Sequence, residues 1–260
     1  MLSPEWLKIS AVAALLALFG VLETLMPARK WHAPRSWRWL WHGVTSGINS
    51  LIVRLIFGSA LTWWCTRVSE WELGILNILH LEECIELMLG LIVYDFLYYW
   101  WHRWNHTFAW LWRFHKVHHV DTHLDVTTGL RFHLGELLVS VIIKLFWVVI
   151  LGPSASMLIL FELFITAAAL FHHTNFDLGD IWDQRLRKIV VTPRYHTAHH
   201  TVAPQSREAN FGTLFSCWDR LFGSYVPVDR RDLVHLGLPR GRNNDLTAQS
   251  LFLGPFGDRY

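Results

Sequence analysis

The sequence predicts an all-α fold: a polytopic membrane protein with about four to five transmembrane helices and a cytosolic helical cap. Hydrophobic residues make up 52% of the 260 residues, which is more than an ordinary soluble domain contains. Several apolar segments reach the length of about 20 residues that a helix needs to cross a bilayer. The chain also contains 16 histidines, which cluster next to these segments and define the cap.

The first two transmembrane helices are predicted near the N-terminus. Leu7 to Met26 is the clearest span, because its charged residues, Lys8 and Glu23, lie only near its ends. A removable signal peptide is the alternative, but no small-x-small cleavage motif follows, so we expect a retained helix. The second span, Val44 to Cys65, contains Arg54 near its middle.

Three further spans are predicted in the central part of the chain. Ile85 to Trp101 is interrupted by Asp95. Leu134 to Leu151 and Ala155 to Phe171 are separated by the dipeptide Gly152-Pro153, which is typical of a tight turn. We therefore expect the last two spans to form a helical hairpin.

The charge of the loops predicts the orientation of these spans. The first loop contains Arg29, Lys30, Arg35 and Arg38 and no acidic residue, whereas the second contains Glu70, Glu72, Glu82 and Glu83 against Arg67. Because basic loops stay in the cytoplasm, the histidine clusters are expected on the cytoplasmic side. The predicted location is the cytoplasmic membrane if the source is bacterial and the endoplasmic reticulum if it is eukaryotic.

Charged residues inside the spans need partners, because each is costly at the bilayer centre. Lys144 and Glu162 lie at similar distances from the hairpin turn, so an intramembrane ion pair is expected; the alternative is that one of them faces a water-filled or substrate cavity. Asp95 shares a helical face with His102 and could orient a metal-bound imidazole. Its alternative role is to pair with Arg54.

The histidines follow three short motifs, one HxxxH and two copies of HxxHH. They are His102 and His106, then His115, His118 and His119, and finally His196, His199 and His200. Residues three or four apart share one helical face, so such imidazoles can bind one ion together. Eight imidazoles exceed the needs of one ion, and nitrogen ligands suit iron, zinc, copper or nickel. The spacing therefore predicts a site for two metals.

Other features of the sequence are less specific. The segment "WHAPRSWRWLWHG" is typical of an interfacial belt, with a role at the substrate headgroup as the alternative. The segment "SCWDRLFGSYVP" is amphipathic and is expected to lie on the membrane or pack on the cap. The net charge of +2 gives no indication of nucleic-acid binding. The three cysteines show no CxxC spacing and are expected to be free.

Five longer motifs resemble the fatty acid hydroxylase superfamily, which includes sterol desaturases and C-4 methyl sterol oxidases. They are "YYWWHRWNH", "RFHKVHHVD", "DVTTGLRFH", "FHHTNFDL" and "TPRYHTAHH", the last followed by "NFGTLFSCWDRLFGSY". The resemblance covers residues 85–230. It implies a membrane-bound non-haem di-iron centre that uses O2 to hydroxylate or desaturate a C–H bond of a lipid, fatty acyl or sterol substrate. Zinc can replace iron in a purified form.

The resemblance also implies a set of site residues. The implied metal ligands are His102, His106, His115, His118, His119, His133, His172, His173, His196, His199 and His200. At least one of His172 and His173 is expected to bind metal, while His133 departs from the family pattern, since Leu134 stands where relatives often have proline. Asp95 and Asn175 are the candidate catalytic residues. Asn210 and Asp219 are candidates for contacts behind the ligands, and the remaining histidines, His32, His42, His80, His123 and His235, are expected at the surface.

The sequence also predicts three domains and leaves one main alternative function open. Residues 1–84 are predicted to form N-terminal transmembrane helices with an interfacial loop, residues 85–230 the catalytic domain, and residues 231–260 a C-terminal tail. No haem, flavin or iron–sulfur motif is present, so electrons are expected from a separate reductase partner. The alternative is a membrane metal transporter or storage protein. A membrane zinc hydrolase is less favoured, because no HExxH motif is present.

Overall fold

The computed structural model describes residues 4–31, 35–227 and 235–239, and these residues form helices joined by loops. In chain order the helices are α1 (Pro4–Leu25), α2 (Arg35–Phe57), α3 (Ala60–Glu70), α4 (Ile75–Leu79), α5 (Glu83–Thr107), α6 (Ala109–His119), the 3-10 helix η1 (Val126–Leu130), α7 (Leu134–Leu151), α8 (Ala155–His173), α9 (Asp180–Leu186), α10 (Pro193–His199), α11 (Pro204–Arg207) and α12 (Cys217–Leu221). Only isolated β-bridges occur in this part of the chain. The all-α prediction is confirmed. Most of the predicted C-terminal tail lies outside the described residues.

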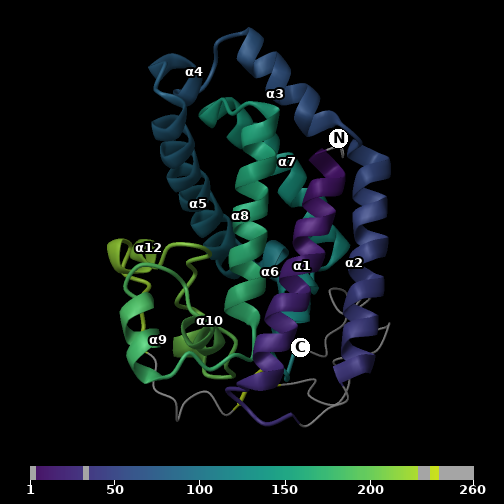
Figure 1. The fold of residues 1–260 in the computed structure, drawn as a ribbon, viewed down its shortest axis with the longest axis vertical. Coiled ribbons are helices and arrows are strands. Elements are labelled where there is room, and N and C mark those ends of the chain that lie inside the picture. Colours follow the sequence, from purple (N-terminus) through teal and green to yellow (C-terminus); the bar gives the residue numbers. More distant parts are fainter. Residues whose placement is uncertain (1–3, 32–34, 228–234, 240–260) are drawn as a thin grey trace.

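Figure 1 shows the long helices running side by side, with α9, α10 and α12 gathered at one end and α3 and α4 at the other. In the described part of the chain, four helices are long and apolar enough to cross a membrane: α1, α5, α7 and α8. A fifth span is possible if α2 is counted together with α3 and α4. The predicted number of spans is therefore confirmed.

The second predicted span is wrong in its bounds. The chain bends by 46° between α2 and α3–α4, because Gly58 has a φ of +47° and interrupts the helix. In addition, α2 begins at Arg35 and thus takes up much of the Trp-rich segment that was expected to be an interfacial belt. Arg38 and His42 in this segment are fully buried. A hydropathy window does not detect such polar residues pointing inward.

The predicted hairpin of the fourth and fifth spans is confirmed. Gly152 ends α7 with a φ of +72°, and the Ser154 hydroxyl caps α8 by accepting from the Met157 N–H at 3.2 Å. Gly74, in the loop before α4, packs on this turn so closely that a Cβ there would lie 2.4 Å from the Gly152 nitrogen. The turn is therefore held against the α3–α4 connection.

The hydrophobic core lies between α3, α5, α7 and α8, and it includes Tyr94, Trp147 and Phe161. The predicted ion pair lies beside it: Lys144 Nζ is 2.7 Å from Glu162 Oε1. Both side chains also line a cavity that reaches the histidines. The ion pair and its alternative, a cavity-facing charge, are thus both present.

The N-terminal helices are connected to the histidine-rich end by buried charges. Arg38 of α2 forms two hydrogen bonds with Asp121, at 2.7 and 2.8 Å, and one with Asp125 at 3.0 Å. Glu23 of α1 accepts hydrogen bonds from the backbone N–H groups of Val126 and Asn175, both at 3.0 Å. These contacts fix the loop that follows α6, and so they fix the position of the second histidine motif.

The histidines outside the motifs are distributed differently from the expectation. His42 is fully buried and its Nδ1 is hydrogen-bonded to Thr127 Oγ1 at 2.8 Å, so its expected surface position is wrong. His80 and His235 are exposed, as expected, and His123 is partly buried. His32 lies outside the described residues.

Candidate metal centre

Nine buried or nearly buried histidines form two groups at the end of the long helices. Within each group, one ring nitrogen per histidine lies within 4.8 Å of the others. The first group is His102, His106, His115, His119 and His199, and the second is His118, His173, His196 and His200. The rings of His119 and His200 stack with their centroids 4.3 Å apart, so the two groups are adjacent.

Each HxxHH motif divides its histidines between the two groups. On α6, His115 and His119 belong to the first group and His118 to the second. Around α10 the division is reversed: His196 and His200 belong to the second group and His199 to the first. The doubled motif therefore provides ligands to both positions, and α5 and α8 complete one position each.

Hydrogen bonds fix the tautomer of most of these rings, because a carbonyl or carboxylate oxygen accepts a hydrogen bond and therefore places the ring proton on Nδ1. The pairs are His102 with Phe211 O (2.8 Å), His106 with Glu208 (3.2 Å), His115 with Glu136 (3.0 Å), His118 with Arg131 O (3.1 Å), His173 with Ala169 O (2.6 Å) and His199 with Ala209 O (2.7 Å). The lone pair of each neutral ring is then on Nε2. Metal ligation requires such a neutral imidazole.

Two rings of the second group, His118 and His173, lie in positions that need a cation between them. His118 and His173 both donate from Nδ1 to a backbone carbonyl, yet their Nε2 atoms are only 3.0 Å apart. Two lone pairs at this distance repel each other unless a proton or a metal ion lies between them. Burial lowers the pKa of His118 well below its ordinary value, which disfavours the proton.

The distances within the groups also suit one ion per group. Nε2–Nε2 distances of 3.1 Å join His106 to His119, His173 to His196, and His196 to His200. Nitrogens bound about 2.0–2.1 Å from one ion are separated by roughly 2.8–3.4 Å, between adjacent octahedral and tetrahedral positions. Among the described residues, the buried Nε2 atoms of His115 and His199 have no hydrogen-bond partner. The residues present therefore fit a pair of bound metal ions.

Burial keeps these imidazoles neutral. It lowers the pKa values of His118, His119, His196, His199 and His200 well below the ordinary value for histidine. Neighbouring histidines lower them further, because two cations at such short distances repel each other.

A short segment after α11 supplies several of the acceptors that orient the rings. The carbonyl oxygens of Ala209, Phe211 and Thr213 accept from His199, His102 and His172. Asp219 holds this segment by accepting from the backbone N–H groups of Phe211 and Gly212, both at 2.7 Å. This contact agrees with the expectation that Asp219 acts behind the ligands.

Asp95 holds the next part of the same segment. Its carboxylate accepts from the N–H groups of Leu214 and Phe215, at 2.9 and 3.0 Å, and from Trp218 Nε1 at 2.8 Å. Among the described residues, the donors of these three hydrogen bonds do not include His102, the imidazole that Asp95 was expected to orient. Asp95 therefore holds the segment whose carbonyls lie behind the rings, and its catalytic role stays a prediction.

The side-chain amide of Asn175 accepts from the Arg29 N–H at 2.9 Å and donates to the Arg29 carbonyl at 2.8 Å. It connects the end of α8 to the segment after α1 and, among the described residues, forms no hydrogen bond with an imidazole. These contacts are structural, and the catalytic role of Asn175 stays a prediction.

Two of the implied ligands lie outside both groups. His133 caps α7 by accepting at Nδ1 from the Gly135 N–H at 2.9 Å, and its ring stacks on Phe114. His172 lies closer: its ring centroid is 3.9 Å from that of His196, and its Nδ1 donates to Thr213. Of the pair on α8, His173 is the member that joins a group.

Glu136 and Glu208 contact the site but were not predicted. Glu136 is buried and pairs with His115, whereas Glu208 is partly exposed and pairs with His106. Glu136 lies three residues after His133 in "LRFHLGE", so an acidic residue at the start of an apolar span was the available signal. Glu208 lies in an ordinary polar loop and gives no such signal.

An internal cavity of about 230 Å³ connects the centre to the long helices. Its lining includes His102, His115 and His173 at one end and Lys144 and Glu162 of the α7–α8 hairpin. Leu137, Ile165 and Ala169 form part of its wall. The cavity therefore lies between the histidines and helices that are apolar enough to cross a membrane.

Comparison with known proteins agrees with this arrangement. The sequence model of the fatty acid hydroxylase family matches residues 87–224, just over half of the chain. The chain is 27% identical to alkylglycerol monooxygenase of Danio rerio, over 74% of this chain and 37% of the relative. It is 28% identical to ornithine lipid hydroxylase OlsE of Rhizobium tropici, over 59% of this chain and 45% of the relative. It is 29% identical to methylsterol monooxygenase 1-3 of Arabidopsis thaliana, over 58% of this chain and 53% of the relative.

The fold and the centre define a helical protein with several candidate membrane spans and a buried histidine site able to hold metal ions. The chain belongs to the fatty acid hydroxylase family. It spans less than half the length of the alkylglycerol monooxygenase and ornithine lipid hydroxylase it matches. No solved structure matches it.

Proposed function

We propose that this protein is a membrane-bound non-haem di-iron oxidase that uses O2 to hydroxylate or desaturate a C–H bond of a lipid, fatty acyl or sterol substrate. One observation supports this most strongly: two adjacent groups of buried histidines open into a cavity between the long apolar helices. The relatives named as lipid and sterol monooxygenases support the same reaction class.

The two histidine groups would each hold one iron ion. The first ion would be bound from His102, His106, His115, His119 and His199, and the second from His118, His173, His196 and His200. Bound iron supplies the redox chemistry that an unactivated C–H bond requires. Zinc is expected to compete for the same nitrogens, because it binds more tightly along the Irving–Williams order.

The residues around the ligands would position the substrate and exclude water. Ile165, Ala169 and Leu137 give the cavity an apolar wall, which suits a hydrocarbon chain and keeps water from the reacting carbon. Glu136 and the carbonyls of residues 209–213 would keep the rings in one orientation while the metals change oxidation state.

We also propose that the histidine-rich end faces the cytoplasm and that a separate reductase supplies the electrons. The basic loop before α2 favours the cytoplasm as the side of the histidine-rich end. A metal transporter would bind its ion near the bilayer midplane on broken helices. The positions of the groups, at the ends of α5 and α8 and beyond, favour the oxidase over this alternative.

Oxygen uptake with isotopically labelled O2 tests the proposal. Iron-loaded protein in detergent, given a chemical reductant and a lipid extract, should consume O2 only when lipid is present. Label in the lipid product indicates hydroxylation, whereas unlabelled alkene indicates desaturation. His118→Ala should abolish lipid-dependent uptake, and exposed His80→Ala should leave it unchanged. Tight metal binding by the wild type without any lipid oxidation would instead favour transport or storage.

A further inference from the structure

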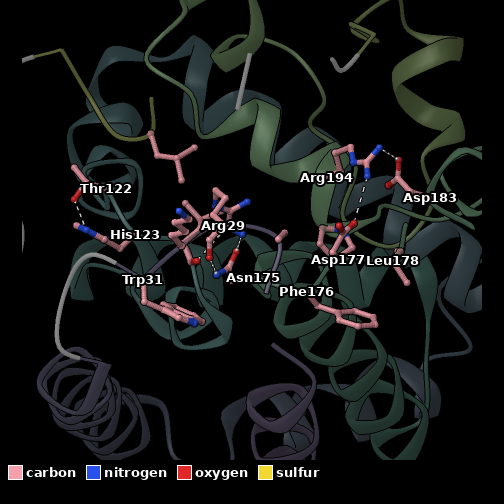
Figure 2. A pocket seen from close by; sticks show the side chains of 15 residues that line it. Arg29, Trp31, Thr122, His123, Asn175, Phe176, Asp177, Leu178, Asp183 and Arg194 are labelled. Carbon is pink, nitrogen blue, oxygen red and sulfur yellow. Dashed lines mark hydrogen bonds and ion pairs between the residues drawn. The ribbon is translucent and has the colours of Figure 1, made fainter. Parts of the chain in front are cut away.

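A second cavity, of about 390 Å³, lies at the histidine-rich end but outside the metal centre. Its lining comes from the segments directly after α1 and after α8, the loop after α6 and the start of α10. Figure 2 shows Arg29 in the middle of the labelled residues, near His123, Trp31 and Asn175. Two candidate membrane spans, α1 and α8, end at this cavity. It therefore lies where a bilayer crossed by these helices would present its headgroups.

Among the described residues, the guanidinium of Arg29 has only neutral hydrogen-bond partners. It donates to the Thr197 hydroxyl at 3.2 Å and to the Leu124 carbonyl at 3.3 Å. A guanidinium has five N–H donors, and a carboxylate or phosphate is its usual bidentate partner. Burial lowers the pKa of Arg29 to about 10, which reflects the cost of holding this charge away from water.

The acidic groups closest to Arg29 bind other cations. Asp121 and Asp125 bind Arg38, and Glu23 binds Arg35 at 2.7 Å. On the far side of the cavity, Arg194 holds Asp177 and approaches Asp183 (Figure 2). Arg194 also pairs with Asp180, which lies outside the lining. Within the described residues, no carboxylate forms an ion pair with Arg29, so its charge is available to an anion in the cavity.

The rest of the lining adds charge and apolar surface. The exposed Lys30 and the ring of His123 lie on the same cavity, together with Trp31, Phe176 and Leu236. We propose that this cavity binds a phosphate group through Arg29, with Lys30 as a second cation and with the apolar residues beside the group that carries the phosphate. The phosphate belongs either to a lipid headgroup or to a free phosphate compound. This inference goes beyond the oxidase reaction and stands independently of it.

Binding measurements in detergent micelles test the proposal. The probes are inorganic phosphate, a short-chain phosphatidic acid and the matched short-chain diacylglycerol, each titrated into the full-length protein by calorimetry. Arg29→Met should weaken binding of the phosphate probes by about tenfold or more, since hydrogen bonds to a charged group contribute about that much. Arg29→Lys should recover part of the affinity. Arg113→Met, which removes an exposed arginine outside the cavity, should bind like the wild type.

The probes also distinguish the two sources of phosphate. Phosphatidic acid binding at least tenfold more tightly than inorganic phosphate supports a lipid headgroup, and equal affinities support a free phosphate group. The proposal is overturned if the wild type binds neither phosphate probe, if diacylglycerol binds as tightly as phosphatidic acid, or if Arg29→Met binds both with wild-type affinity. Thermal unfolding of each variant shows whether it is folded, and Arg29→Lys provides the comparison if Arg29→Met is not.

Discussion

At the scale of single residues, the side chains that would bind metal were predictable, but the groups that orient them were not. The histidine motifs have a spacing that a helix explains, so eight of the nine grouped histidines could be found from the sequence alone. The ninth, His173, was implied only by the family resemblance, which did not distinguish it from His172. The backbone carbonyls of Ala209, Phe211 and Thr213 leave no mark in the sequence, because every residue has a carbonyl. Asp95 was noticed as a charge in a span, but its contacts with Leu214 and Phe215 depend on tertiary packing.

Asp95→Asn is expected to lower iron affinity about ten- to a hundredfold, the usual effect of losing a residue that supports a metal ligand. The amide can accept fewer of the three hydrogen bonds that hold residues 214–218, so the adjoining segment 211–213, whose carbonyls orient His102 and His172, becomes less fixed. Competition with a chelator measures the affinity. Glu83→Gln, at an exposed position on the same helix, is the control. Unchanged affinity in Asp95→Asn would contradict this role.

At the scale of helices, the apolar periodicity and the turn signals predicted most elements, and the failures have physical causes. The α7–α8 hairpin follows from two apolar runs and a Gly-Pro dipeptide. The helix α2 was placed too late, because its first half is polar and its polar residues point inward to bind Asp121 and Asp125. A hydropathy average treats such buried polar residues as surface residues.

Lys144→Met is expected to destabilise the protein by about 1–3 kcal/mol, because it leaves the partly buried carboxylate of Glu162 without its cation. Lys144→Met combined with Glu162→Gln should cost clearly less than the sum of the single changes. Equilibrium unfolding in detergent gives the free energies for this double-mutant cycle. Strict additivity would show that the pair does not stabilise the α7–α8 hairpin.

Arg38→Met is likewise expected to cost about 3–5 kcal/mol of unfolding free energy, since Asp121 and Asp125 would stay buried without their cation. Arg67→Met is the matched control: it breaks the exposed pair with Glu70, which contributes about 1 kcal/mol or less. Chemical unfolding of both variants in the same detergent provides the comparison. Equal losses in the two variants would refute a special role of the α2 contact.

At the scale of the whole molecule, the sequence predicted that all histidine motifs meet at one end, and the structure brings them together there. The loop charges and the number of spans were enough for this prediction. The division of each HxxHH motif between the two groups was not predictable. It depends on how α6 and α10 are packed against α5 and α8, which the spacing within one helix does not determine.

The metal-free protein is expected to lose stability as the pH falls below about 6.5, the pKa of an unperturbed histidine. Burial lowers the folded-state pKa of His118, His119, His196, His199 and His200, so the unfolded chain binds more protons in this range. Their contribution is fully present above about pH 6.5 and is lost progressively below it. Unfolding midpoints of chelator-treated protein at several pH values measure the effect. A midpoint that rises as the pH falls through this range would contradict it.

Metal analysis of purified wild-type and variant protein tests most directly whether the two histidine groups bind iron. We expect iron in both groups of the wild type, loss of the ion of the first group in His199→Ala, and loss of the ion of the second group in His173→Ala. Exposed His80→Ala should keep the full iron content. If His199→Ala and His173→Ala both retain the wild-type amount of iron, the two groups are not the metal centre.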